Sequence, residues 1–318
     1  MSLDINRSQI ESALRTFNAG YRHYLHETPL LKAPGAAFGF NCKEVWLKLE
    51  HLQTSGSFKA RGMLNRLLSH AIPESGVIVA SGGNAGIATA AAAKLLGVRC
   101  EVFVPTISSP AKQARLKALG AELNVVGSAY SEALAACLER QKQTGALLTH
   151  AYDQPEVVIG AGTVAAEIDR QAGTAPDSML VSVGGGGLIA GIASWYAGSA
   201  TRVIALEPAL ASTLHAARAA GEPVDVSVGG IAADSLGAKR IGNIAWGITQ
   251  QHVKQSLLLS DESIRAAQQW LWREMKLAVE PAAALGLAAL QTGIYKPRAD
   301  ECVCLVICGA NMDPASLA

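Results

Sequence analysis

The sequence of 318 residues has little charge and few aromatic side chains: 17% of its residues are Asp, Glu, Lys or Arg, and 5% are Phe, Trp or Tyr. The 27 Lys and Arg residues nearly balance the 26 Asp and Glu residues, and no block of like charges stands out. Nucleic acids and anionic membranes are bound through such blocks, so we expect neither as a partner. Because half of the residues are apolar, a disordered chain is excluded and a large globular protein is predicted.

The six cysteines lack the spacing of a disulfide framework, and no CxxC pair occurs. The N-terminus also lacks the basic segment and apolar run of a secretory signal, so we expect reduced thiols in a cytoplasmic protein. The segment 178–201 carries no charge and is long enough to span a bilayer, but it contains six glycines. A strand, a glycine loop and a buried helix explain this segment better, and we expect no membrane span.

Strand-like and helix-like segments alternate along the chain. The first clear strand is "GVIVAS" (76–81), the last is "ECVCLVIC" (301–308), and helical patterns separate the strands. This alternation predicts βαβ units and largely parallel sheets, arranged as two α/β lobes with a cleft between them. Near the N-terminus, Ser8 and Glu11 have the spacing of a capping box and predict the start of a first helix.

The first of three glycine-marked turns is "ASGGNAG" (80–86), between a strand and a helix. Parallel sheets bind ligands at the carboxyl ends of their strands, where such turns lie. The backbone N–H groups at the helix start favour an anion, and Ser81 and Asn84 add hydrogen-bonding side chains. Asn and Gly are also ordinary turn residues, so a binding site and a simple helix cap remain alternatives here.

The second turn, "SVGGGGLIAG" (182–191), has four consecutive glycines whose N–H groups have no Cβ atoms in the way. Strand–helix packing rarely needs four glycines, so the turn predicts a phosphate site. However, Gly185, Gly187 and Ala190 also fit the GxGxxG/A dinucleotide fingerprint, with Glu207 at the end of the next strand. An NAD-dependent oxidoreductase is therefore a competing hypothesis. The absence of GxxxxGK[ST] disfavours a nucleoside triphosphatase.

The third turn follows the last strand in "CLVICGAN" (304–311). Most cysteines of this strand are expected to be small buried apolar residues, but Cys308 lies at the carboxyl end of the strand, next to Gly309.

One lysine, Lys59, lies in the polar stretch "EHLQTSGSFKARG" (50–62), directly after Phe58. A lysine becomes a nucleophile toward carbonyl groups when burial lowers its pKa. Most lysines are solvated surface charges, and composition alone does not distinguish the two roles for Lys59.

Together these motifs resemble those of the fold type II pyridoxal-phosphate enzymes, in the threonine/serine dehydratase and serine racemase group. "HLQTSGSFKARG" looks like the lysine signature of that family, "SGGNAG" its asparagine loop and "GGGGL" its phosphate loop. "TPL" (28–30), "LEP" (206–208), "SLGAKRIG" (235–242) and "VEPAAA" (279–284) match in the same order. The resemblance covers nearly the whole chain and decides against the nicotinamide enzyme.

The resemblance implies a fold and a division of the chain. The fold has two lobes of open, mostly parallel twisted sheets flanked by helices, with pyridoxal 5′-phosphate in the cleft between them. The large cofactor-binding domain is expected to comprise 1–46 plus 151–318, and the small substrate-side domain 47–150. A homodimer is the expected assembly.

Roles for individual residues follow from the same resemblance. Lys59 is implied to bond to the cofactor and to act as the catalytic base, with Phe58 packed near the cofactor. Asn84 is implied to hydrogen-bond the phenolic oxygen of the cofactor ring, and Cys308 to lie beside the pyridine nitrogen. The phosphate is expected against Gly184, Gly185, Gly186, Gly187 and Leu188. The carboxylate of an amino-acid substrate is expected against Ser81, Gly82 and Ala85.

The activity implied is a dehydratase, or ammonia-lyase, that converts L-threonine, L-serine or both into 2-oxobutanoate or pyruvate plus ammonia. A neutral thiol at Cys308 leaves the pyridine nitrogen largely unprotonated, which suits β-elimination better than transamination. Alternatives are a lyase for another β-hydroxy or β-substituted amino acid, a serine racemase-type activity and an inactive relative. Because Gly82 stands where the racemases carry a second serine, we expect little racemisation.

The metal site of this group is only partly matched. Glu207 and Ala211 correspond to two of its ligands, but Thr213 replaces an acidic residue, so a weakly bound divalent ion, a monovalent cation or no ion remain alternatives. In the last case Glu207 pairs with an arginine or caps a helix. The chain ends seven residues after Asn311, without room for the C-terminal regulatory domain of biosynthetic threonine dehydratases. We therefore expect a role in amino-acid catabolism without feedback by isoleucine.

Overall fold

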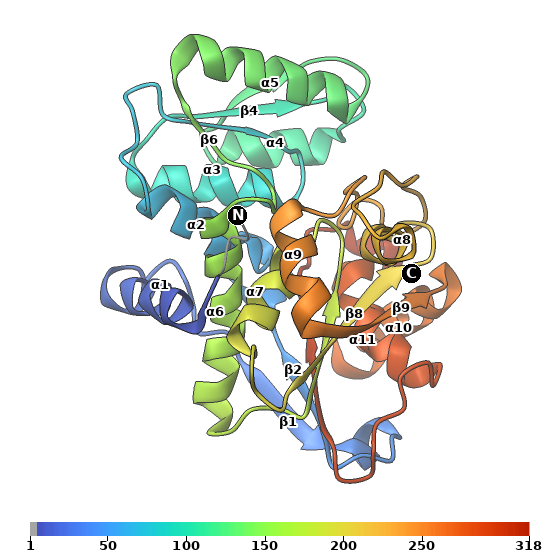
Figure 1. Ribbon diagram of the computed structural model, residues 1–318. Helices are drawn as coiled ribbons and strands as arrows, with labels where there is room; N and C mark the ends of the chain where they lie inside the picture. The colour runs from blue at the N-terminus through green and yellow to red at the C-terminus, as the bar shows by residue number, and fades with distance from the viewer. Residues whose placement is uncertain (1–4, 318) are drawn as a thin grey trace.

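The computed structural model of the protein describes residues 5–317, which form two α/β lobes (Figure 1). The larger lobe contains a six-stranded sheet in the order β1-β2-β10-β7-β8-β9, and the smaller lobe a four-stranded sheet in the order β5-β4-β3-β6. Neighbouring strands are parallel except for β1 and β2, which pair antiparallel. The predicted fold of two largely parallel sheets is thus confirmed.

The strands of the larger sheet are β1 (Leu30–Pro34), β2 (Glu44–Lys48), β7 (Ser178–Ser182), β8 (Arg202–Pro208), β9 (Val253–Leu259) and β10 (Cys302–Val306). Those of the smaller sheet are β3 (Val77–Ala80), β4 (Cys100–Val104), β5 (Glu122–Val125) and β6 (Leu147–Leu148). The α-helices are α1 (Arg7–Gly20), α2 (Lys59–Leu68), α3 (Asn84–Leu96), α4 (Pro110–Ala118), α5 (Tyr130–Thr144), α6 (Pro155–Ala172), α7 (Gly187–Trp195), α8 (Thr213–Ala220), α9 (Asn243–His252), α10 (Asp261–Met275) and α11 (Pro281–Gln291). Short 3₁₀ turns include η2 (Glu50–Leu52) and η3 (Thr54–Gly56).

Alternate residues of the smaller sheet face different helices. On β3, Ile78 and Ala80 belong to an apolar cluster with residues of α5, whereas Val77 and Val79 belong to a cluster with residues of α3. This division follows from the two-residue period of a strand, and Figure 1 shows α5 and α3 on opposite sides of the sheet. The turn between β3 and α3 is thereby held at the carboxyl end of a buried strand.

Helix α6 leads from the smaller lobe into the larger one and packs closely against α2 and α7. A Cβ atom on Gly160 of α6 would lie 2.5 Å from the carbonyl oxygen of Arg61 on α2. A Cβ atom on Gly191 of α7 would lie 2.5 Å from the nitrogen of Gly162 on α6. Because close-packed backbones cannot accept such contacts, both helix crossings require glycine. They fix α2, whose first residue is Lys59, against the larger lobe.

The first helix begins earlier than the sequence pattern indicated. The cap of α1 is Asn6, whose side chain accepts a hydrogen bond from the N–H of Gln9 (3.1 Å), while the Gln9 side chain accepts one from the N–H of Asn6 (2.9 Å). The capping box predicted at Ser8 and Glu11 was therefore wrong, because an equivalent pattern two positions earlier forms the cap.

The predicted boundary between 46 and 47 falls inside β2, whose five residues all pair in the larger sheet. By strand pairing, the larger lobe therefore extends at least to Lys48; the division into domains otherwise stays a prediction. The uncharged segment 178–201 forms β7, the glycine turn and α7. Within residues 5–317, none of the helices has the length and apolarity needed to cross a bilayer.

Candidate functional site

Lys59 is held at the start of α2 by a turn that contacts the end of β10. Ser55 and Gly56, just before it, both have left-handed backbone conformations, with φ of 67° and 77°. Ser57 forms an isolated antiparallel bridge with Gly309, and the N–H of Phe58 donates to the carbonyl oxygen of Cys308 (3.1 Å). The lysine turn and the cysteine at the end of the last strand are therefore joined directly through their backbones.

The amine of Lys59 lies in a polar but uncharged setting. Its Nζ donates to the carbonyl oxygen of Ala151 (2.5 Å) and lies 5.1 Å from the centre of the Phe58 ring. No carboxylate among residues 5–317 forms an ion pair with it. Desolvation lowers the pKa of Lys59 to about 8, and the nearby Cys308 opposes this only in part. A substantial fraction of this amine is thus neutral and nucleophilic near physiological pH.

The glycine turn after β7 has the geometry of an anion-binding site. Gly186 has a left-handed φ of 89° and caps α7, and a Cβ atom there would lie 2.5 Å from the Cβ of Ala245. A Cβ atom on Gly185 would lie 2.2 Å from the ring of Tyr152. No acceptor among the described residues bonds the N–H groups of Gly185, Gly186 and Gly187. Unsatisfied N–H groups at a helix start, free of side chains, fit a phosphate group.

One short segment connects the lysine with the glycine turn. Ala151 accepts the hydrogen bond of Lys59, and the next residue, Tyr152, packs its ring against Gly185. Asp153 in turn accepts hydrogen bonds from the N–H groups of Asn243 and Ile244 at the start of α9 (both 3.0 Å). The predicted nucleophile and the predicted phosphate turn thus lie on two sides of the same segment.

The turn after β3 places Asn84 among polar groups from the larger lobe. Asn84 Nδ2 donates to both carboxylate oxygens of Glu280 (3.0 Å each), and its Oδ1 accepts from Asn311 Nδ2 (2.6 Å). Asn311 Nδ2 also donates to the carbonyl oxygen of Ser55 (2.8 Å). The asparagine turn, the lysine turn and the segment after β10 therefore meet at one hydrogen-bonded cluster. Its members Glu280 and Asn311 were not predicted as site residues, although Glu280 lies in the "VEPAAA" motif and Asn311 in the turn after the last strand.

The residues predicted to hold the substrate carboxylate share this turn. The N–H of Gly83 donates to Ser81 Oγ (3.3 Å), and Ala85 is buried in the first turn of α3. A Cβ atom on Gly82 would lie 3.1 Å from Ser108 Oγ, so a side chain at this position would crowd the loop after β4. Their role in substrate binding stays a prediction.

Cys308 is buried, and burial raises the pKa of its thiol well above its ordinary value, with Glu280 adding to the effect. The thiol is therefore neutral, as expected of an uncharged partner for a ring nitrogen. All six cysteines are free.

Glu207 caps a helix in this structure. Its carboxylate accepts hydrogen bonds from the N–H groups of Leu214 and His215 in the first turn of α8 (2.8 Å each) and from Ser256 Oγ (2.8 Å). Thr213 donates to the carbonyl oxygen of Gly184 (2.5 Å) and so supports the phosphate turn. Within residues 5–317, no three His, Cys, Asp or Glu side chains gather as a metal site. The cation at Glu207 and Ala211 stays a prediction without further support.

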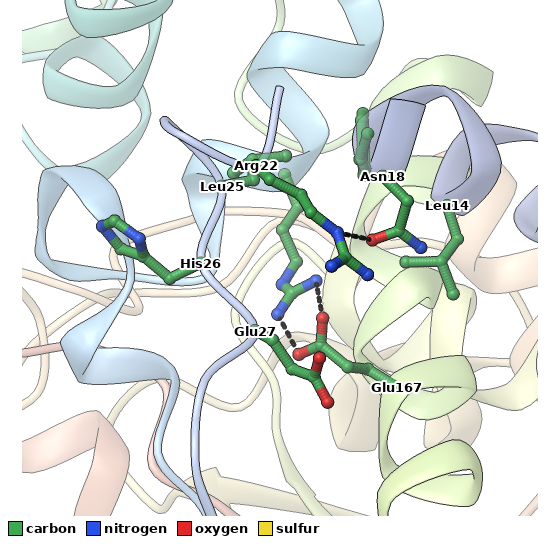
Figure 2. Close-up of a pocket in the computed structure, with 9 residues that line it drawn as sticks. Leu14, Asn18, Arg22, Leu25, His26, Glu27 and Glu167 are labelled. Atoms are coloured by element: carbon green, nitrogen blue, oxygen red, sulfur yellow. Dashed lines mark hydrogen bonds and ion pairs between the residues drawn. The ribbon is translucent and has the colours of Figure 1, made fainter. Parts of the chain in front are cut away.

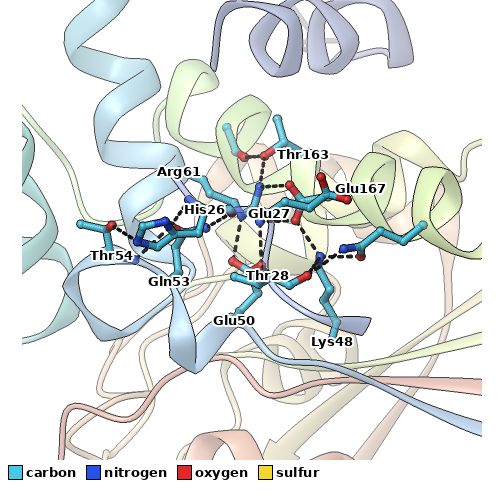
Figure 3. Close-up of polar contacts among 12 residues, drawn as sticks. His26, Glu27, Thr28, Lys48, Glu50, Gln53, Thr54, Arg61, Thr163 and Glu167 are labelled. Carbon is cyan, nitrogen blue, oxygen red and sulfur yellow. Dashed lines mark hydrogen bonds and ion pairs between the residues drawn. The ribbon is translucent and has the colours of Figure 1, made fainter. Parts of the chain in front are cut away.

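A buried ionic network lies beside α2. Arg61 donates to both oxygens of Glu50 (2.7 and 2.8 Å) and to Glu167 (2.6 Å), and Lys48 donates to Glu167 (2.6 Å) and the carbonyl oxygen of Thr28 (2.8 Å) (Figure 3). Burial alone would raise the pKa of Glu167, but Arg61 and Lys48 outweigh burial and hold that pKa below its ordinary value. The network anchors α2 to α6 two residues after Lys59.

A pocket of about 360 Å³ opens on the outer side of this network (Figure 2). Its lining residues are Leu14, Phe17, Asn18, Arg22, Leu25, His26, Glu27, Arg61 and Glu167. None of the residues predicted to bind cofactor or substrate lines it, so this pocket is separate from the predicted site.

Comparison with known families and proteins agrees with this geometry. The family described as "Pyridoxal-phosphate dependent enzyme" matches residues 22–309. The L-threonine ammonia-lyase of Geobacter sulfurreducens is 37% identical, over 85% of this chain and 67% of its own length. The phenylserine dehydratase of Ralstonia pickettii is 32% identical, over 96% and 94%. The tomato biosynthetic threonine dehydratase is 35% identical, but the chain spans only 48% of its length.

Solved structures show the same fold over the whole chain. Maize serine racemase superposes with a TM-score of 0.91 at 28% identity, covering 99% of this chain and 96% of that one. The T.th. threonine deaminase superposes with a TM-score of 0.88 at 32% identity, covering 97% and 99%.

Proposed function

Because this chain belongs to the family of pyridoxal-phosphate dependent enzymes, with pyridoxal 5′-phosphate as its cofactor, we propose that it is a dehydratase, or ammonia-lyase, of L-threonine and L-serine. The products would be 2-oxobutanoate or pyruvate plus ammonia. The observation that carries the proposal is the buried amine of Lys59, which has no ionic partner among the described residues and is joined to the anion-binding turn through Ala151 and Tyr152. The names of the relatives support this reaction.

Bound pyridoxal phosphate supplies an electron sink for negative charge at the substrate α-carbon. The free N–H groups of Gly185, Gly186 and Gly187 would bind its phosphate, and the neutral thiol of Cys308 would face the ring nitrogen without protonating it. Lys59 would hold the cofactor covalently. Once the substrate amine had displaced Lys59 from this bond, the freed Nζ would take the proton from the substrate α-carbon, a step for which an amine with a pKa of about 8 is suited.

The turn from Ser81 to Ala85 would orient the substrate. Its N–H groups lie at the start of α3, and the Ser81 hydroxyl is beside them, so the turn suits a carboxylate. Gly82 offers no hydroxyl on this turn, so the proposal includes elimination with little racemisation.

A lyase for a larger β-hydroxy amino acid is the second candidate. The phenylserine dehydratase matches nearly end to end, whereas this chain spans only two thirds of the threonine ammonia-lyase. A Cβ atom on Gly83 would have only the carbonyl oxygen of Asp234 within 4 Å (3.8 Å), so the asparagine turn leaves room on that side. Serine racemase-type activity is the third alternative.

An assay of 2-oxo acid formation separates these candidates. L-Threonine and L-serine are expected to yield a 2-oxo acid, and phenylserine is expected to react more slowly. L-Serine is expected to yield only traces of D-serine. The control is Lys59→Ala, which should form no product with any substrate. A faster turnover of phenylserine would support the second candidate, and rapid D-serine formation the third. A colourless protein that takes up NADH and no pyridoxal phosphate would exclude all three.

The pKa of Lys59 predicts how the apoprotein reacts with added cofactor. Only the neutral amine attacks an aldehyde, so the rate of covalent uptake of pyridoxal phosphate should rise up to a midpoint near pH 8 and level off above it. The rate is measured from the absorption of the bound cofactor and confirmed by borohydride trapping on Lys59. A free lysine derivative, measured in parallel, corrects for ionisation of the cofactor itself. A rate that still rises tenfold per pH unit above pH 9 would contradict the lowered pKa.

We further propose a cytoplasmic homodimer acting in amino-acid catabolism. The free state of all six cysteines and the resemblance to the dehydratase group support this proposal. Sedimentation equilibrium of the purified protein measures the assembly directly.

A further inference from the structure

One buried acid next to the predicted site is Glu280, the residue before α11, which is 4% exposed. Its carboxylate has no ionic partner among the described residues and is held by hydrogen bonds from Asn84 Nδ2 and from the N–H of Asn311 (2.9 Å). Burial raises the pKa of this carboxyl, while Asn84 and Asn311 counteract the rise. Burying a carboxylate without a cation lowers the stability of the fold, so we expect Glu280 to have a function beside Asn84.

The geometry assigns one N–H bond of Asn84 to Glu280. Nδ2 lies 3.0 Å from both carboxylate oxygens. The two oxygens of one carboxylate subtend a much smaller angle at Nδ2 than the angle between its two N–H bonds. One N–H is therefore shared between the oxygens, and the other remains free. On the opposite side of the amide, Oδ1 accepts from Asn311 Nδ2 (2.6 Å).

These two contacts fix which way the Asn84 amide faces. Turned over, Asn84 would direct its oxygen at the Glu280 carboxylate and its NH₂ at the NH₂ of Asn311, so both contacts would become repulsive. Asn311 is itself held, because its Nδ2 also donates to the carbonyl oxygen of Ser55. Only one orientation of the Asn84 amide satisfies the cluster.

We propose that Glu280 is a positioning residue for the cofactor: its carboxylate, with Asn311, holds Asn84 in the orientation whose free N–H hydrogen-bonds the phenolic oxygen of pyridoxal phosphate. The inference rests on the proposed function, and Glu280 acts only through Asn84. It also connects cofactor binding to the lysine turn, because Asn311 bridges Asn84 and Ser55.

The test compares Glu280→Gln with Asn84→Ala and with the double variant. A glutamine keeps the size of Glu280 but has a single acceptor oxygen. Because Asn84 Nδ2 contacts both carboxylate oxygens, the glutamine NH₂ meets Asn84 donor to donor in either orientation. We expect pyridoxal phosphate to bind about tenfold more weakly to Glu280→Gln, with a shifted absorption band and a shifted pH midpoint of that band. Asn84→Ala should show the same changes, and the double variant should be no weaker than Asn84→Ala alone.

The matched control is Glu301→Gln, which removes a buried carboxylate at the opposite end of β10, where it pairs with Arg202. It should lower thermal stability without changing the absorption band or the dissociation constant of the cofactor. Should Glu280→Gln fail to fold, Glu280→Asp keeps the charge but withdraws the carboxylate from Asn84, and should reproduce the cofactor changes.

Unchanged cofactor affinity and absorption in the folded Glu280 variants, or additive effects in the double variant, would overturn the inference while leaving the proposed function intact. If the wild-type protein takes up no pyridoxal phosphate, the proposed function itself is contradicted. The two failures are therefore distinguishable.

Discussion

Lys59→Met is expected to abolish turnover and, in the absence of cofactor, to make the protein more stable by about 1–2 kcal/mol. The folded protein holds the Lys59 amine in a desolvated place where its pKa is about 8, against 10.5 for an ordinary lysine. Below pH 8 the amine is charged in both the folded and the unfolded chain, and the folded state bears the full cost of that buried charge. Methionine has a similar length and no charge, so it removes the cost.

The sign of this effect depends on pH. As pH rises from 8 toward 10.5, the folded protein loses the proton while the unfolded chain keeps it, so the cost shrinks. The stabilisation by Lys59→Met should thus be largest below pH 8 and vanish above about pH 10.5. The amine is desolvated, but the residue Lys59 as a whole is only half-buried, and in the variant the carbonyl of Ala151 loses its donor. For both reasons the expected stabilisation is smaller than the full free energy of the pKa change.

Urea unfolding of the apoprotein at pH 7 and pH 10 measures the effect. Lys142→Met is the matched control, since Lys142 is exposed and its contact with Glu139 is a surface pair that contributes little. It should leave stability and turnover unchanged. A Lys59→Met apoprotein that is less stable than the wild type at pH 7 would show that Lys59 is a structural lysine.

The alternation of strands and helices predicted the fold because each buried strand and each amphipathic helix carries its own local pattern. The start of α1 could not be predicted in the same way. The same capping spacing occurs twice, in Asn6 with Gln9 and in Ser8 with Glu11, and only the structure shows that the first pair forms the cap. The boundary near 46 was misplaced within β2 for a related reason. That strand pairs with β10, from the other end of the chain, and no local signal reveals this pairing.

The site residues show the same difference between local patterns, which the sequence reveals, and long-range contacts, which it does not. Lys59, Asn84 and the glycine turn belong to short motifs that can be recognised from neighbouring residues. The acceptor of Lys59 is the backbone carbonyl of Ala151. Because every residue type has this carbonyl, the sequence could not indicate the contact. Glu280 joins the site through contacts with a turn almost two hundred residues away in the chain, which become visible only when both lobes are in place.

Arg61→Met is expected to cost about 3–5 kcal/mol of stability, the largest effect we predict for a single side chain. Arg61 donates to Glu50 and Glu167, and both carboxylates are buried with it (Figure 3). Removing the guanidinium leaves two buried carboxylates to share Lys48, whose only ion pair within the described residues is with Glu167. Because a single ammonium cannot replace the forked contacts to two acids, Arg61→Lys should recover only part of the loss.

Thermal or urea unfolding near neutral pH measures this loss. Arg99→Met is the control, because Arg99 pairs with Glu122 on the surface, where both side chains are more than half exposed, and its loss should cost less than about 1 kcal/mol. A similar small cost for Arg61→Met would mean that the network is not a stabilising anchor of α2.

Acidification should distinguish the loss of this charge from the loss of packing. In the wild type the pKa of Glu167 lies below its ordinary value, so its contribution is present above about pH 4.5 and is lost as pH falls through the lowered pKa. In Arg61→Met the same carboxyl is buried with less positive charge nearby, so its pKa rises and the acid becomes neutral at a higher pH. The stability difference between the two proteins should therefore narrow as pH is lowered from 7 toward 4. A lost packing contact would leave that difference constant with pH.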